Sequence, residues 1–82
     1  MDREKIMERI LKWQILADRY SNDNTKVFIK TISGNFHFCN IVLVGETKLT
    51  VDNYGPDQRA GTRDIIDWLQ IETFEEVRDN GN

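Results

Sequence analysis

The sequence predicts a small α+β domain, mainly β, in which one N-terminal helix precedes a bent five-stranded antiparallel barrel. Three observations predict this fold. Apolar residues recur at helical spacing over residues 3–20, strand-forming runs separated by turn residues fill residues 26–52, and a further apolar segment covers residues 64–71. With 82 residues, the chain is expected to form a single domain over residues 1–82.

The helix is predicted over residues 3–20. Its main apolar residues are spaced four, three, four and three positions apart, which places them on one face; they are Ile6, Ile10, Trp13, Ala17 and Tyr20. Met7, Leu11 and Ile15 widen this stripe. Asp2 can cap the start of the helix, and the turn-forming residues 21–24 end it. The stripe is expected to pack on the sheet, with docking of a partner as the alternative.

The barrel is predicted over residues 26–72. Its first three strands are expected at residues 26–33, 36–44 and 48–52, and they are joined by turns at Gly34–Asn35 and Gly45–Thr47. The second strand is long for a small domain, so it is expected to bend and to serve both halves of the sheet.

Alternation along each strand assigns its side chains to two faces. In the first strand, one face carries Val27, Ile29 and Thr31, and the other carries Phe28, Lys30 and Ile32. In the second strand, one face carries Phe36, Phe38, Asn40, Val42 and Val44, and the other carries His37, Cys39, Ile41 and Leu43. Apolar residues occur on both faces of the first strand, so either the helix or a neighbouring chain is expected to cover the second face.

The last third of the chain is less regular. Residues 57–62 are interpreted as a loop or a short strand, and residues 64–71 as one strand or as a helical turn followed by a strand. Residues 73–82 are acidic and are predicted to form a frayed tail.

Composition excludes several classes of protein. Cys39 is the only cysteine, so a disulfide within the chain is excluded, and one Cys with one His cannot supply the four ligands of a zinc cluster. We expect no cofactor. A run of about 18 apolar residues is absent, so no membrane span is expected. The charged N-terminus does not resemble a signal peptide, and with the unpaired cysteine it favours a cytoplasmic location.

Residues 27–53 carry a pattern of strand, Gly turn, strand, short turn and strand ending near Asn53. With the preceding helix, this pattern resembles the Sm-like (LSm/Hfq-like) superfamily of SH3-like barrels. The matching positions are Val27, Ile29, Ile32, Gly34, Ile41, Val44, Leu49, Val51 and Asn53. Arg63 falls where the family places a basic residue before its last strand.

The chain departs from the family at four places. Where bacterial members carry a Tyr-Lys-His signature before the last strand, this chain has Gly61, Thr62 and Arg63, so only the basic character remains. Gly45 stands where the family usually has Asp in the turn after the second strand, and Cys39 replaces a second Gly that lets this strand bend. Lys48 falls near a position where some members contact an RNA base through Asn. The resemblance therefore implies the fold more strongly than the RNA pocket.

RNA binding is the activity that the resemblance implies, and the residues predicted for it are Arg59, Arg63 and Tyr54, with Lys48 and Lys30 as weaker additions. Arginine beside an aromatic ring can stack on bases and pair with phosphates. The alternative interpretation is a loop whose charges only keep it solvated.

Other candidate residues have structural interpretations. His37 is expected at a surface or edge position, Cys39 in the core, and Trp13 and Trp68 as packing residues, with a subunit contact as the alternative for Trp68. The acids Asp57, Asp64 and Asp67 are expected to be solvated.

The sequence thus predicts a non-catalytic binding module, not an enzyme. The leading hypothesis is an Sm-like protein that forms a homo-oligomeric ring through its edge strands and contacts RNA. The alternative is a protein-interaction or structural adaptor that has lost the RNA site. The net charge of −3, with three Arg against seven Asp and Glu in residues 56–82, favours the adaptor.

Overall fold

The computed structural model describes residues 3–54 and 61–77. One helix, α1 (Arg3–Asp23), precedes the strands β1 (Lys26–Thr31), β2 (Phe36–Val44), β3 (Lys48–Asn53) and β4 (Arg63–Asp67). A short 3₁₀ helix, η1 (Trp68–Gln70), leads into β5 (Ile71–Glu76). The helix is three residues longer than predicted. Directly after it, Asn24 has a left-handed backbone conformation with a φ of 56°.

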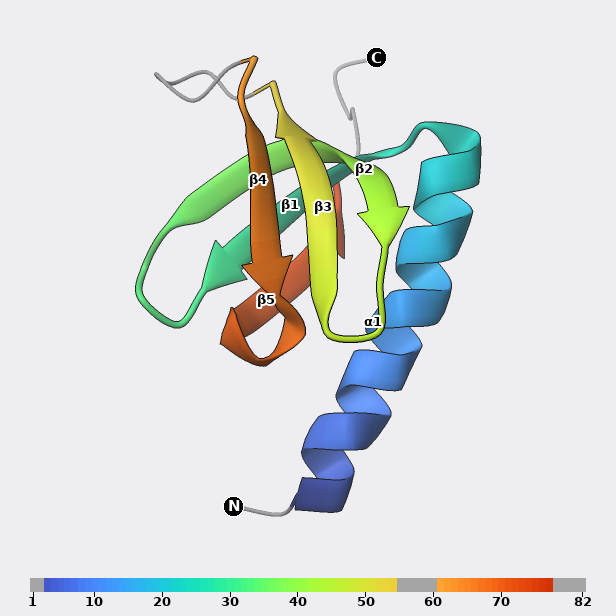
Figure 1. The fold of residues 1–82 in the computed structure, drawn as a ribbon, viewed down its shortest axis with the longest axis vertical. Coiled ribbons are helices and arrows are strands. Elements are labelled where there is room, and N and C mark those ends of the chain that lie inside the picture. The colour runs from blue at the N-terminus through green and yellow to red at the C-terminus, as the bar shows by residue number, and fades with distance from the viewer. Residues whose placement is uncertain (1–2, 55–60, 78–82) are drawn as a thin grey trace.

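The five strands form one sheet in the order β4-β3-β2-β1-β5, and every neighbouring pair is antiparallel. Figure 1 shows this sheet strongly curved, with α1 along one side. The predicted α+β class and the bent five-stranded antiparallel sheet are confirmed. The sheet is not closed into a barrel, because β4 and β5 are its two edges and are not paired with each other.

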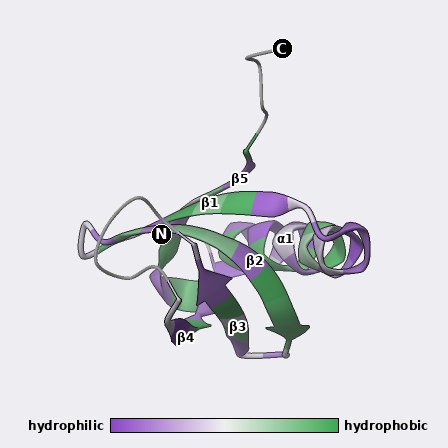
Figure 2. Cartoon of the chain, turned by 90° about the horizontal axis from the view of Figure 1, so that it is seen from above, coloured by the Kyte–Doolittle hydropathy of each residue, from purple (hydrophilic) through white to green (hydrophobic). Residues whose placement is uncertain are grey.

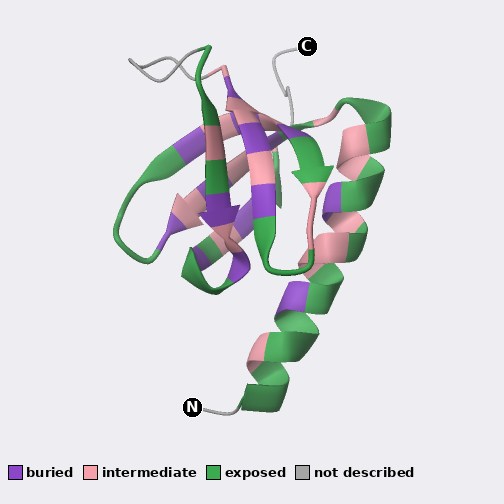
Figure 3. Ribbon diagram, viewed as in Figure 1, coloured by how far each residue is buried: buried purple, intermediate pink, exposed green. Residues whose placement is uncertain are grey.

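Helix α1 covers the core with one face. Ile10 and Ala17 are buried, and Ile6, Trp13, Leu16 and Tyr20 pack around them (Figure 3). The predicted packing of this stripe on the sheet is confirmed. Met7, Leu11 and Ile15 do not join it: they are 50%, 55% and 66% exposed, because their positions have turned away from the sheet.

The long strand β2 bends at an irregularity in its pairing with β3. The register shifts between Ile41 and Leu43, so the alternation of faces is interrupted there. Leu43 is therefore 64% exposed, although unbroken alternation places it with the buried His37, Cys39 and Ile41. Seen from above, the hydrophobic end of β2 curves down beside α1 (Figure 2).

The segment after β3 resolves into three elements. Residues 64–71 fit neither of the two interpretations, because residues 64–67 belong to the strand β4, the helical turn η1 follows over residues 68–70, and Ile71 begins β5. Asp67 caps η1 by accepting a hydrogen bond from the Leu69 amide at 2.9 Å. The chain then pairs with β1 as far as Glu76, so the prediction of a frayed tail from residue 73 is wrong for residues 73–76. Residues 78–82 lie outside the described residues.

The side chain of Trp68 connects η1 to the β2–β3 turn. Its side chain is 2% exposed, and its Nε1 donates a hydrogen bond to the Gly45 carbonyl oxygen at 2.9 Å. A packing role for Trp68 is confirmed. Among the described residues, no helix combines the length and the apolar character needed to cross a membrane.

Candidate nucleic-acid interface

Arg63 is the first residue of β4, and its side chain is exposed. Its guanidinium donates two hydrogen bonds to the Asp52 carboxylate, from Nε at 2.7 Å and from Nη2 at 3.1 Å. The hydrogen bonds and charge of Arg63 lower the pKa of Asp52, so the two charges largely neutralise each other. Arg59 lies outside the described residues.

Lys48 is far from Arg63. In the ladder between β3 and β4, Lys48 is opposite Asp67 and Asp52 is opposite Arg63. Four residues of strand separate the two ends, which is about 13 Å at ~3.3 Å per residue. The structure therefore does not bring Lys48 and Arg63 into one site.

Lys30 and Tyr54 do share a surface, because aromatic rings connect them. These rings, which we call the aromatic row, are Phe36, Phe28, Phe38 and Tyr54. The successive ring centroids are 5.8, 5.1 and 6.4 Å apart. Each spacing lies within the range for interacting aromatic pairs.

A lysine lies over each end of the aromatic row. The Nζ of Lys26 is 4.7 Å from the centroid of the Tyr54 ring, and the Nζ of Lys30 is 5.9 Å from the centroid of the Phe36 ring. Both distances permit cation–π attraction. The row with its two lysines is thus a continuous aromatic surface with positive charge at both ends.

The pairing of β1 with β2 builds this surface. Phe28 is opposite Phe38, and Lys30 is opposite Phe36. Alternation turns Val27, Ile29 and Cys39 into the core, so the intervening residues face outward. Phe36 is 49% exposed, and the other three rings are half-buried.

Acidic residues border the aromatic row on one side. Glu72 lies 3.8 Å from the Nζ of Lys30, and Glu75 on β5 is opposite Phe28. An exposed ion pair of this length contributes little free energy. The lysine side chains can therefore exchange these partners for a ligand.

Phe28, Phe36 and Phe38 were not among the predicted site residues. Alternation already places Phe28 with Lys30 and Phe36 with Phe38 on common faces. The sequence does not give the register of β1 against β2. That register places the face with Phe28 and Lys30 beside the face with Phe36 and Phe38.

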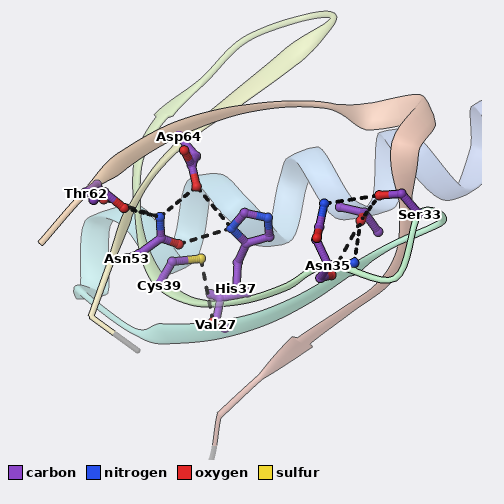
Figure 4. Close-up of polar contacts among 9 residues, drawn as sticks. Val27, Ser33, Asn35, His37, Cys39, Asn53, Thr62 and Asp64 are labelled. Carbon is purple, nitrogen blue, oxygen red and sulfur yellow. Dashed lines mark hydrogen bonds and ion pairs between the residues drawn. The ribbon is translucent and has the colours of Figure 1, made fainter. Parts of the chain in front are cut away.

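His37 is buried, contrary to the prediction of a surface or edge position. The residue is 7% exposed, and its Nδ1 lies 3.1 Å from Oδ1 of Asn53 and 3.4 Å from Oδ2 of Asp64 (Figure 4). The curvature of the sheet brings β4 over β2, which covers the imidazole. Asp64 is partly solvated, as predicted, but it also accepts a hydrogen bond from Asn53 Nδ2 at 2.8 Å. Asp57 lies outside the described residues.

Cys39 is buried, as predicted. Its thiol donates a weak hydrogen bond to the Val27 carbonyl oxygen at 3.7 Å. Burial, with a smaller contribution from the charge of Asp64, raises the pKa of the Cys39 thiol to about 12. Such a thiol is a packing group and a poor nucleophile.

No family model, no curated protein and no solved structure matches this chain. The Sm-like resemblance therefore rests on the residues quoted above.

Proposed function

We propose that this protein is a non-catalytic binding module of Sm-like ancestry that binds single-stranded RNA on the outer face of β1 and β2. The observation that carries the proposal is the aromatic row with a lysine at each end. Bases stack on aromatic side chains, and lysines attract the phosphates between them.

This proposal moves the RNA site away from Arg63. Arg63 is engaged with Asp52, whereas the partners of Lys26 and Lys30 among the described residues are the rings beside them and Glu72. Two of the five residues predicted for RNA binding, Lys30 and Tyr54, belong to the new site. A cytoplasmic location is part of the same proposal.

Binding should be measured by fluorescence anisotropy of labelled oligo-U and oligo-A at about 0.1 M salt. Phe36→Leu keeps an apolar side chain but removes the most exposed ring of the row. A base stacked on an aromatic ring contributes about 1–3 kcal/mol, so Phe36→Leu should weaken binding by roughly 5- to 150-fold.

Arg63→Ala is the control, since it removes a positive charge outside the aromatic row and should leave the affinity unchanged within about twofold. A loss of affinity with Arg63→Ala but not with Phe36→Leu would contradict the proposal. So would the absence of any binding tighter than about 0.1 mM.

The second candidate function is assembly of the chain with copies of itself. The strands β4 and β5 are the two edges of the sheet, and each pairs with a neighbouring strand on one side only. On β4, Ile65 is 67% exposed. Pairing β4 of one copy with β5 of the next would satisfy both edges and cover Ile65. An adaptor of this kind needs no RNA.

Light scattering over a range of concentrations tests this assembly. We expect a mass above that of the 9.6 kDa chain, reduced to the monomer mass by Ile65→Lys on the edge strand. Met7→Lys adds the same charge at an exposed apolar position of α1 and should leave the mass unchanged. A monomer at every concentration would rule out the assembly.

A further inference from the structure

A polar pocket of about 380 Å³ opens on the inner side of the sheet, next to the β1–β2 turn. One wall is formed by Thr31, Ser33 and Asn35 of that turn, and the other by Asp64 and Asp67 of β4 with Gln70. His37 forms the floor between them. Pockets for small molecules begin at roughly this volume. The aromatic row is on the opposite face of β2, so the pocket is a separate surface.

The hydrogen bonds of Asn53 determine which ring nitrogen carries the proton in the neutral imidazole of His37. The Nδ2 of Asn53 donates to Asp64 Oδ2 at 2.8 Å and to Thr62 Oγ1 at 3.1 Å. A carboxylate only accepts, so the amide must present its nitrogen to Asp64 and its oxygen to His37. The Nδ1 of His37 therefore faces two acceptors, Asn53 Oδ1 and Asp64 Oδ2, and must carry the proton.

The other ring nitrogen of His37 is then an acceptor in the neutral imidazole. In Figure 4 it points away from Asn53 and Asp64, toward the side where Asn35 and Ser33 lie. Within the part of the chain that the structure describes, Nε2 has no hydrogen-bond partner, although the residue is 7% exposed. Among the described residues, no buried side-chain nitrogen or oxygen lacks a partner, so Nε2 is accessible and presents an acceptor to the pocket.

Two carboxylates of the pocket are acceptors as well. Asp67 uses Oδ1 to accept from the Leu69 amide, and its second oxygen has no partner among the described residues. Among the described residues, the lining includes the carboxylates of Asp64 and Asp67 and no lysine or arginine. Anions are repelled by such a pocket, and a cation with several N–H groups fits it.

We propose that this pocket binds a guanidinium group. Guanidinium is planar, always charged at neutral pH and offers five N–H donors in a fixed fork, with no acceptor of its own. It can donate to His37 Nε2 and to a carboxylate at the same time. The guanidinium can come from a free small molecule or from an arginine side chain of a protein.

NMR provides a direct test, because His37 is the only histidine and its ring nitrogens give unambiguous signals. The free protein should show the tautomer protonated on Nδ1. Titration with methylguanidinium at constant ionic strength should shift the Nε2 signal with saturation, whereas inorganic phosphate should not. A linear, unsaturated shift up to 100 mM methylguanidinium would overturn the proposal.

Variants separate the pocket from general charge effects. Asp67→Asn should weaken methylguanidinium binding at least fivefold, whereas Glu72→Gln removes an acid outside the pocket and should leave it unchanged. Equal effects of the two variants would contradict the proposal. Agmatine and an arginine-containing tripeptide distinguish the two sources: tighter binding of agmatine indicates a small molecule, and tighter binding of the peptide indicates a protein ligand. RNA binding on the aromatic row is not involved in any of these readouts.

Discussion

At the scale of single residues, Asn53 connects two parts of the molecule. Its amide joins the β2 residue His37 to the β4 residue Asp64 and to Thr62. These hydrogen bonds satisfy the side-chain amide of Asn53, a residue that is only 3% exposed. The Sm-like pattern includes Asn53, and the hydrogen bonds give that position a structural role in this chain.

Cys39 provides a pH-dependent prediction. Its pKa is raised from 9.0 to about 12 in the folded protein, so folding disfavours the thiolate. The stabilisation is complete below pH 9, the value for the unfolded chain, and is lost as the pH rises toward 12. We expect the folded protein to resist thiol reagents at pH 8 and the urea-unfolded protein to react at once.

Urea denaturation at pH 8 and pH 11 measures the same effect. Cys39→Ala should show a smaller loss of stability between these pH values than the unaltered protein. Tyr54, whose pKa burial also raises, remains in both proteins and accounts for part of the residual loss. Rapid thiol modification of the folded protein at pH 8 would show that Cys39 is not buried.

At the scale of elements, the β2–β3 turn explains a departure from the Sm-like pattern. A Cβ atom on Gly45 would lie 2.8 Å from the Lys48 carbonyl oxygen, closer than real contacts allow. The Gly45 amide also donates to that oxygen at 2.9 Å, and the Gly45 carbonyl accepts from Trp68. The aspartate usual in the family cannot occupy this position unless the turn shifts.

Gly45→Ala should therefore destabilise the protein by about 1–3 kcal/mol, the usual cost of forcing an extra carbon into a packed site. Urea denaturation gives the free energy of unfolding. Thr47→Ala in the same turn is the matched control, because its side chain is exposed and only its backbone oxygen binds Trp68. Equal stabilities of the two variants would show that the turn adapts freely.

At the scale of the whole molecule, charge limits how RNA can be held. The protein carries a net charge of −3, so attraction must come from Lys26 and Lys30 locally. Two phosphate contacts on a single strand predict a slope of log K against log salt of about −1.4. Lys26→Gln should reduce the magnitude of that slope by about 0.7, and it should leave the contribution of base stacking unchanged.

Anisotropy titrations between 50 and 200 mM salt measure this slope. A slope steeper than about −4 would mean that many more cations contact the strand, in which case the aromatic row would not be the main site. Thr50→Gln, a neutral change on β3, should not alter the slope.

The sequence alone determined the order and type of the elements from α1 to β3, because hydrophobic periodicity and turn residues are local signals, but it did not predict β5 beyond residue 72. The inward face of α1 followed from spacing, whereas the core positions of Cys39 and Trp68 were expected from their residue types. Spacing also placed β2 over residues 36–44, the range that the structure gives.

The tertiary structure decided which of these residues meet. The burial of His37 depends on β4 crossing over β2, the exposure of Leu43 on a register shift, and the aromatic row on the alignment of β1 with β2. The register of two strands is set by hydrogen bonds between backbone segments that are distant in the sequence. A local pattern of side chains therefore does not predict it. For this reason both the candidate RNA surface and the His37 pocket emerged only from the folded chain.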